Sequence, residues 1–189
     1  MRLIRTLLAF SALCCVPVIA AADPIQWSSA VGGNDHWYGL TPALASFEEL
    51  ELWAESSTHL GMRGYLVSIH SAEENEFLVE TFGGEYQYVL GFTDVAAEGV
   101  WRWVSGEPTT YTNWRPGEPN NAGNEDYAIF NWRHAGEPPS VPGGFWNDVP
   151  GAGGFGIVEY GPMIPEPASM LLLGTGLLGL GRSWRKRRG

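Results

Sequence analysis

Cysteine and lysine are almost absent from this chain of 189 residues. The two cysteines, Cys14 and Cys15, are adjacent near the N-terminus, so the rest of the chain contains no pair that could form a disulfide bond. The one lysine, Lys186, lies among the last four residues, and between positions 23 and 165 only four arginines stand against 20 acidic residues. Such a negatively charged surface excludes nucleic acid as a natural partner. It favours solubility and the binding of divalent cations.

The N-terminus has the pattern of a secretory signal peptide. Two arginines precede an apolar run from Leu7 to Ile19, and three alanines follow it before Asp23. We therefore expect residues 1–22 to be removed on export, which leaves a mature domain without disulfides. The alternative is a lipoprotein anchored through Cys14 or Cys15, but neither cysteine follows the small residue that such an anchor expects.

The C-terminus, residues 162–189, has a three-part pattern. Pro165-Glu166-Pro167 is followed by an uncharged run over 168–181 and then by an arginine-rich end. This pattern resembles the PEP-CTERM sorting signal of Gram-negative bacteria. The resemblance implies an inner-membrane intermediate with its basic end in the cytoplasm, cleavage near Pro165 by an exosortase-type enzyme, and delivery to the cell surface, the exopolysaccharide matrix or the medium. The alternative is an anchor that is never cut, although the run is short for a permanent span of about 20 residues.

Two helix starts have the capping-box pattern, in which a serine and the glutamate three residues later satisfy each other's backbone N–H groups. They are Ser46–Glu49 and Ser71–Glu74. We expect the first helix to continue toward His59 and the second to stop at Gly83-Gly84.

Short alternating and aromatic runs predict strands at 65–69, 86–92, 100–104, 127–132 and 156–160. Because helices come early and strands late, the sequence predicts an α+β fold with small antiparallel sheets rather than a parallel βαβ sheet. Two irregular stretches, 105–126 and 133–144, separate the later strands. A loop as long as the first is either functional or a sign of misassigned elements.

Oxygen-bearing side chains gather in the first irregular stretch and again about twenty residues later, just after the second. The set is Glu118, Asn120, Glu125, Asn147 and Asp148. With no cysteine in the domain and the four histidines elsewhere, the set disfavours zinc and favours a hard cation. Calcium, which takes six to eight oxygens in loose geometry, fits better than magnesium. The alternative is that these residues are ordinary turn formers in the loops of an acidic protein.

The order of the motifs resembles the C-type lectin domain over roughly His36 to Tyr160. The motifs are Ser46–Glu49, Gly64–Ile69, Val89–Asp94, Glu98–Trp103, Asn113-Trp114, Gly117–Asn121, Glu125-Asp126, Trp146–Asp148 and Gly156–Glu159. The resemblance implies a C-type lectin-like fold over residues 23–161, with two helices flanking small antiparallel sheets and a long calcium-binding loop region. We expect Trp101, Trp103, Trp114 and Trp146 to be packing aromatics within it.

The resemblance also implies a role for the five oxygen-bearing residues. In that family a Glu-Pro-Asn triplet, a following Glu and an Asn-Asp pair hold one calcium at the sugar site, so Glu118, Asn120, Glu125, Asn147 and Asp148 would bind both the calcium and the sugar hydroxyls. The family associates Glu-Pro-Asn with mannose- and glucose-type sugars, and its peptide bond before Pro119 is cis.

A second, auxiliary calcium is implied less directly. Asp94, Glu98, Asn121 and Asp126 match the family's auxiliary positions, although Glu98-Gly99 also suits a plain turn. The family's two usual disulfides are missing, since Tyr127, Gly151 and Val158 stand at three of their cysteine positions. We expect calcium and the aromatic core to offset a loss of about 2 to 4 kcal/mol per missing disulfide. The 133–144 stretch, close to Asn147, puts the choice of monosaccharide in doubt.

The leading interpretation is therefore an exported, non-enzymatic, calcium-dependent carbohydrate-binding protein. One alternative is a structural or adhesion domain of the same fold that binds protein or only structural calcium. Another is a glycosidase with paired carboxylates, but clustered carboxylates are better explained as shared metal ligands than as an acid and a base with separated pKa values.

Overall fold

The computed structural model describes residues 22–83, 86–133, 137 and 143–162. The expected signal peptide, the Pro165-Glu166-Pro167 motif and most of the 133–144 stretch lie outside these residues. Within them, no helix is both long and apolar enough to cross a bilayer.

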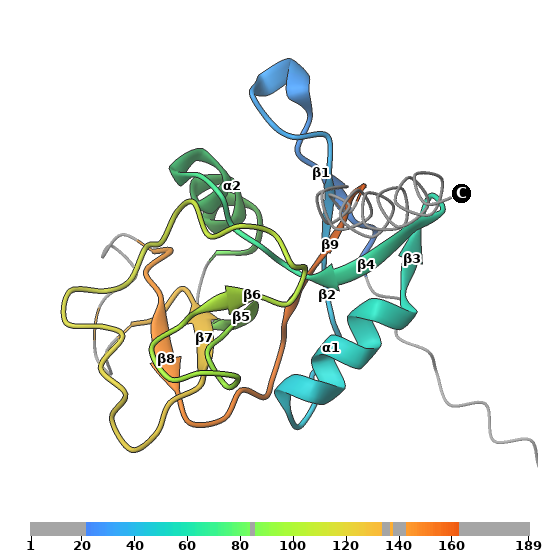
Figure 1. Ribbon diagram of the computed structural model, residues 1–189. Helices are drawn as coiled ribbons and strands as arrows, with labels where there is room; N and C mark the ends of the chain where they lie inside the picture. The colour runs from blue at the N-terminus through green and yellow to red at the C-terminus, as the bar shows by residue number, and fades with distance from the viewer. Residues whose placement is uncertain (1–21, 84–85, 134–136, 138–142, 163–189) are drawn as a thin grey trace, which may run out of the picture.

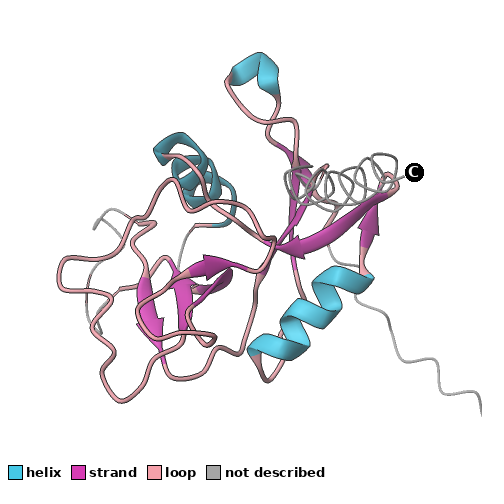
Figure 2. Cartoon of the chain, in the orientation of Figure 1, coloured by secondary structure: helices cyan, strands magenta, loops and turns pink. Residues whose placement is uncertain are grey.

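The described residues form two α-helices and two antiparallel sheets, whose arrangement Figures 1 and 2 show. The helices are α1 (Phe47–Ser56) and α2 (Ala72–Phe82), with a short 3-10 helix, η1 (Ser29–Val31). The five-stranded sheet has the order β1 (Ile25–Gln26), β2 (Trp37–Leu40), β9 (Ile157–Tyr160), β4 (Met62–Leu66) and β3 (Thr58–His59). The four-stranded sheet has the order β6 (Arg102–Trp103), β5 (Tyr88–Thr93), β7 (Tyr127–Phe130) and β8 (Asn147–Val149). Every strand pair is antiparallel, which confirms the α+β prediction.

Both helices begin where the capping boxes predict, but the glutamate arm of each box reaches one residue further back. Each N-cap serine accepts from the backbone N–H three residues later, while each glutamate accepts from the residue before the serine. The bonds are Glu49 N to Ser46 Oγ (3.3 Å), Glu74 N to Ser71 Oγ (3.1 Å), Ala45 N to Glu49 Oε2 (3.0 Å) and His70 N to Glu74 Oε2 (2.7 Å). At each helix start, side-chain oxygens therefore accept hydrogen bonds from backbone N–H groups that the helix itself leaves without a partner.

The first helix is shorter than predicted, and two strands precede it. Helix α1 ends at Ser56 because Ser57 is already extended, and His59 belongs to β3. The expected order of helices before strands is wrong, since β1 and β2 come first. Strand β2 is only four residues long and contains Gly39, so it gives too little alternation to be recognised locally.

The ladder of β4 also begins earlier than the alternating run 65–69 predicts. It covers Met62–Leu66, and Val67, Ser68 and Ile69 continue as buried chain. Strand β8 was not predicted, because its three residues, Asn147–Val149, are mostly polar. Both sheets therefore depend on pairings between segments distant in sequence.

Phe92 of β5 is the centre of an aromatic cluster in the larger core. Its ring lies 4.1 Å from that of Trp103 and within 6 Å of three further indoles, those of Trp101, Trp114 and Trp146. Phe92 and Trp146 are fully buried. The expectation that these tryptophans are packing residues is confirmed, and the cluster joins the four-stranded sheet to the long loop.

A second core lies between α1 and the five-stranded sheet. Phe47, Leu50 and Ala54 are buried there with Leu66 and Val158. Val158, which stands at an expected cysteine position, thus fills its site by apolar packing, and so does Tyr127, whose ring lies 4.7 Å from that of Phe47. Apolar contacts therefore occupy two of the positions where the resemblance implies a disulfide.

Candidate functional site

The middle of the long loop is held to the chain that leads into β8. Trp146 N donates to Asn113 O and Arg115 N donates to Trp146 O, each at 2.9 Å, in a short parallel bridge. Glu118 N then donates to Arg115 O at 2.8 Å, which closes a turn. This geometry brings the Glu118 end of the loop close to β8, which carries Asn147 and Asp148.

Asp148 joins the two arms of the expected site. Its side chain is fully buried, and its two carboxylate oxygens accept hydrogen bonds from Asn120 N (3.2 Å) and Asn121 N (2.7 Å). The preceding Glu118-Pro119 peptide bond is cis, as the resemblance predicts. The loop is therefore held to β8 directly beside its Glu-Pro-Asn triplet.

The other loop residues of the set are connected by short-range hydrogen bonds. Asn120 Nδ2 donates to Glu118, and Ala122 N donates both to Asn120 Oδ1 (2.8 Å) and to Glu125 Oε2 (2.9 Å). Glu125 N donates in turn to Asn121 Oδ1 at 2.7 Å. Glu118, Asn120, Glu125 and Asp148 thus belong to one connected group, in which Glu118 and Asn120 reach the surface.

Negative charge accumulates in this group. Burial raises the pKa of the Glu118 carboxyl, and the charges of Asp148 and Glu125 raise it further, against the opposing hydrogen bond from Asn120. A cation placed among these carboxylates would offset their repulsion. The electrostatics and the all-oxygen donor set fit a hard divalent cation.

Asn147 is the least integrated of the five residues. It lies in β8 and is nearly buried, but its side-chain amide donates to the backbone carbonyl of Asp148 at 2.5 Å. Among the described residues, no three His, Cys, Asp or Glu side chains form a group that could hold a metal by themselves. The expected site therefore depends on the amide oxygens of Asn120 and Asn147 as well as on carboxylates.

The expected auxiliary site is brought together only in part. Asp94 is almost fully buried at the end of β5, where its Oδ2 accepts from Gly99 N at 2.8 Å while its buried Oδ1 has no hydrogen-bond partner. Asp126 lies beside it, since Asp94 N donates to Asp126 O at 3.2 Å. Glu98 is exposed in the turn that closes on Gly99. The unpartnered carboxylate oxygen of Asp94 suits a cation ligand.

Arg115 is a residue of this region that sequence reasoning did not single out. Its guanidinium forms a two-point ion pair with Glu137 and lies over the ring of Phe145, 5.9 Å from the centroid. Both partners of the pair are largely buried. The ion pair connects the irregular stretch 133–144 to the base of the Glu118 turn. The ion pair could not be predicted from a local sequence motif, because Arg115 and Glu137 are 22 positions apart.

A family profile described as "Lectin C-type domain" matches residues 54–148, half of the chain. The chain belongs to the C-type lectin family. A second profile, "PEP-CTERM protein-sorting motif", matches residues 164–188. The chain is accordingly an exported lectin-like protein, from a family whose members are typically non-enzymatic binding proteins and generally bind Ca²⁺.

The chain also resembles individual lectins in sequence. Human "C-type lectin domain family 17, member A" is 35% identical over 112 residues, which is 59% of this chain and 26% of the human protein. The lectin thus spans about a quarter of that relative's length.

Two solved structures have the same fold. One is the EPNH mutant of CEL-I, a C-type lectin from Cucumaria echinata, which is 29% identical to this chain with a TM-score of 0.60. The match covers 76% of this chain and 97% of the CEL-I chain. The cow carbohydrate-recognition domain of CD23, solved in the presence of a GlcNAc2Man3 oligosaccharide, is 28% identical with a TM-score of 0.54, over 67% of this chain and 88% of the cow domain.

Proposed function

We propose that this lectin binds carbohydrate through calcium held by Glu118, Asn120, Glu125, Asn147 and Asp148. The observation that carries the proposal is the connection of the Glu-Pro-Asn turn to Asp148 through Asn120 N and Asn121 N. Those bonds hold the loop, which carries Glu118, Asn120 and Glu125, beside β8, which carries Asn147 and Asp148. Asp94, Asn121 and Asp126, with Glu98 approaching from its turn, would hold an auxiliary calcium.

The carboxylates and the amides of the site have different roles in binding the sugar. Glu118 and Glu125 accept hydrogen bonds from two neighbouring sugar hydroxyls, while the amides of Asn120 and Asn147 donate to the same hydroxyl oxygens. Bound calcium supplies open coordination positions for those two oxygens. Asp148 is oriented by its two backbone donors and keeps the loop in register with β8.

The sugar class proposed is the mannose and glucose type, with neighbouring equatorial hydroxyls. The Glu118-Pro119-Asn120 triplet supports it, and the GlcNAc2Man3 ligand of the cow CD23 domain agrees with that class. The domain is acidic and has few basic side chains, so it suits a neutral glycan better than an anionic one.

A glycan array tests the function and its sugar class together. We expect mannose- or glucose-type glycans to bind in calcium and to be lost in chelator. The double variant Glu118→Gln with Asn120→Asp reverses which side chains donate and accept, so it should lower that binding by about tenfold, or about 1.4 kcal/mol, and favour galactose-type glycans. The single variant Glu76→Gln, with an exposed carboxylate on α2 outside both proposed calcium sites, is the matched control. Binding that survives chelator would exclude a calcium-dependent site.

The route to the surface is proposed from the two ends of the chain. Residues 1–22 would direct export of the domain 23–161 and then be removed. The segment 162–189 would deliver the domain to the bacterial surface or the exopolysaccharide matrix. Intact mass measurement of the mature protein is expected to show a chain that ends near Pro165. A mass that includes Arg188 would show that the segment is retained as an anchor.

A further inference from the structure

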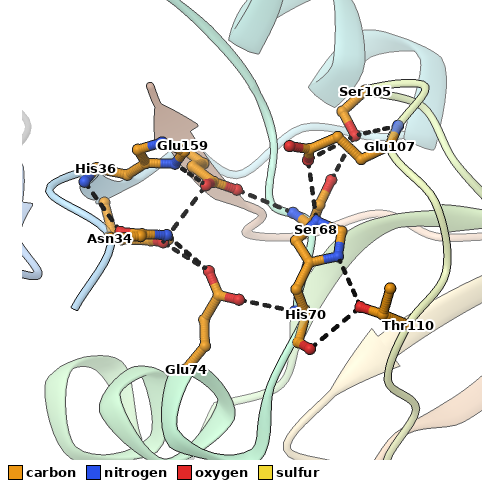
Figure 3. A network of polar contacts seen from close by, with 10 residues as sticks. Asn34, His36, Ser68, His70, Glu74, Ser105, Glu107, Thr110 and Glu159 are labelled. Atoms are coloured by element: carbon orange, nitrogen blue, oxygen red, sulfur yellow. Dashed lines mark hydrogen bonds and ion pairs between the residues drawn. The ribbon is translucent and has the colours of Figure 1, made fainter. Parts of the chain in front are cut away.

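A second group of ionisable side chains is buried in the domain, and the proposed function uses none of its residues. Figure 3 shows this network, in which side chains from five segments converge. Glu74 of α2 and Glu159 of β9 are 2% and 1% exposed. Two carboxylates at such depth are costly unless protons or cations compensate them.

The two carboxylates share one hydroxyl. Tyr38 Oη of β2 donates to Glu74 Oε1 at 2.6 Å and lies 3.4 Å from Glu159 Oε1. Glu159 Oε2 accepts from Ser68 N at 3.1 Å, and Glu74 Oε2 accepts from His70 N at 2.7 Å. Neutral donors thus satisfy much of the hydrogen-bonding capacity of both groups without neutralising their charge.

The available positive charge comes from two histidines. His36 Nδ1 lies 2.6 Å from Glu159 Oε1, and His70 Nε2 lies 3.0 Å from Glu107 Oε2. The side chains of His36 and His70 are 15% and 29% exposed, so both can exchange protons with solvent.

Three further titratable groups lie beside this network. Burial raises the pKa values of Tyr38 and Tyr65 out of the physiological range. Hydrogen bonds from Ser29, with the charge of His36, lower the pKa of Asp35.

His36 also ends the N-terminal arm, residues 23–36, which folds back against the domain. Asn34 Nδ2 donates to Tyr38 Oη (2.7 Å) and to Glu74 Oε1 (3.3 Å), and Trp27 stacks on Phe77 of α2 with ring centroids 5.5 Å apart. Asn34 and His36 thus bind the arm to α2 and to β9, the last strand before the sorting segment.

We propose that His36, Asn34, Tyr38, Glu74 and Glu159 form a proton-dependent clasp, which holds the N-terminal arm in mildly acidic medium and loosens it in alkaline medium.

The direction follows from the titrating groups. Burial would lower the pKa of His36, but the hydrogen bond and charge of Glu159 outweigh it and the pKa is raised. The bond to Glu107 likewise raises the pKa of His70, against burial. Burial, together with the charge of Glu159, raises the pKa of Glu74 to about 7. All three groups bind protons more tightly when folded, so the stability that they provide is lost as pH rises through their folded pKa values.

Glu107 affects the stability of the fold in a different pH range. Burial would raise its pKa, but the hydrogen bond and charge of His70 outweigh burial and the pKa is lowered. Its contribution to stability is therefore lost only in acid, below the range in which the clasp loosens.

Melting curves at pH 5.5 and pH 8.5, all in chelator, test the clasp independently of calcium binding. The wild-type protein should melt several degrees lower at pH 8.5. Glu74→Gln removes the titrating buried carboxyl, so its melting temperature should fall less than that of the wild-type protein between pH 5.5 and pH 8.5. His36→Gln should melt below wild type at pH 5.5 and level with it at pH 8.5. The exposed Glu76→Gln on the same helix should follow wild type throughout.

Hydrogen exchange locates the effect. Trp27 N and Asp35 N bond within the arm, to His36 O and Trp27 O, and their protection, corrected for intrinsic rates, should fall at least tenfold from pH 5.5 to pH 8.5. A wild-type melting temperature that is flat or rises with pH, or variants that run parallel to wild type, would overturn the clasp. Unchanged protection of the two arm amides would overturn its assignment to the arm.

Discussion

Calcium is expected to raise the melting temperature of the lectin by roughly 8 °C when its free concentration is 100 times its dissociation constant. Binding to the folded state alone contributes about 2.7 kcal/mol under that condition. For a domain of this size each kcal/mol moves the melting temperature by about 3 °C. The effect should be large here because no disulfide holds the long loop, which is fixed mainly by Asp148 and the aromatic cluster.

Asp148→Asn should remove most of that shift. The amide presents one acceptor oxygen where the carboxylate presents two, so one of the backbone donors at Asn120 and Asn121 loses its partner. We expect the variant without calcium to lose about 1 to 3 kcal/mol, the cost of an unsatisfied buried donor. Its calcium response should nearly disappear, since the residue would be both a ligand and the anchor of the loop. Differential scanning calorimetry with calcium and with chelator measures both effects.

Asp35→Asn is the matched control. Asp35 is exposed in the N-terminal arm and accepts from Ser29 N, so the change removes a carboxylate of the same kind far from the proposed ligands. It should keep the full calcium shift. If Asp148→Asn responded to calcium as strongly as Asp35→Asn, the proposed ligand set would lose its central member.

The parts of the fold that the sequence predicts best are those with local causes. The two helix starts follow from Ser46 and Ser71, because an N-cap needs only its own side chain and the next turn of backbone. Helix ends and short strands are less predictable. Strand β2 exists because β9 pairs with it across more than a hundred positions, and nothing in Trp37–Leu40 itself requires extension.

The candidate site divides in the same way. The cis bond before Pro119 is foreseen from the resemblance, and the bonds from the loop to Asp148 agree with the order of the motifs. Calcium binding by the five oxygen-bearing residues stays a prediction. The buried pair Glu74 and Glu159 is not foreseen. Glu74 reads as a capping residue and Glu159 as part of a strand, and their proximity arises only when β9 and α2 meet at Tyr38. Charge burial is a tertiary property that a linear pattern does not display.

Phe92→Ala is expected to cost about 3 to 5 kcal/mol, the range for removing a large aromatic from a core. Its ring is the shared neighbour of Trp103, Trp101, Trp114 and Trp146, so the cavity would separate the sheet from the base of the long loop. Near-ultraviolet circular dichroism should weaken with the loss of stability, since those four indoles lose their fixed environment.

Phe155→Ala provides the comparison, because Phe155 is 39% exposed and contacts only Tyr86 among the ring pairs of the described residues. Its cost should stay below about 1 kcal/mol. Phe92→Leu keeps part of the volume and should fall between the two, which preserves a measurable variant if Phe92→Ala does not fold. Should Phe92→Ala and Phe155→Ala melt alike, the aromatic cluster would not be what replaces the absent disulfides, and the stability of the long loop would have to come from the bonds to Asp148 and from calcium.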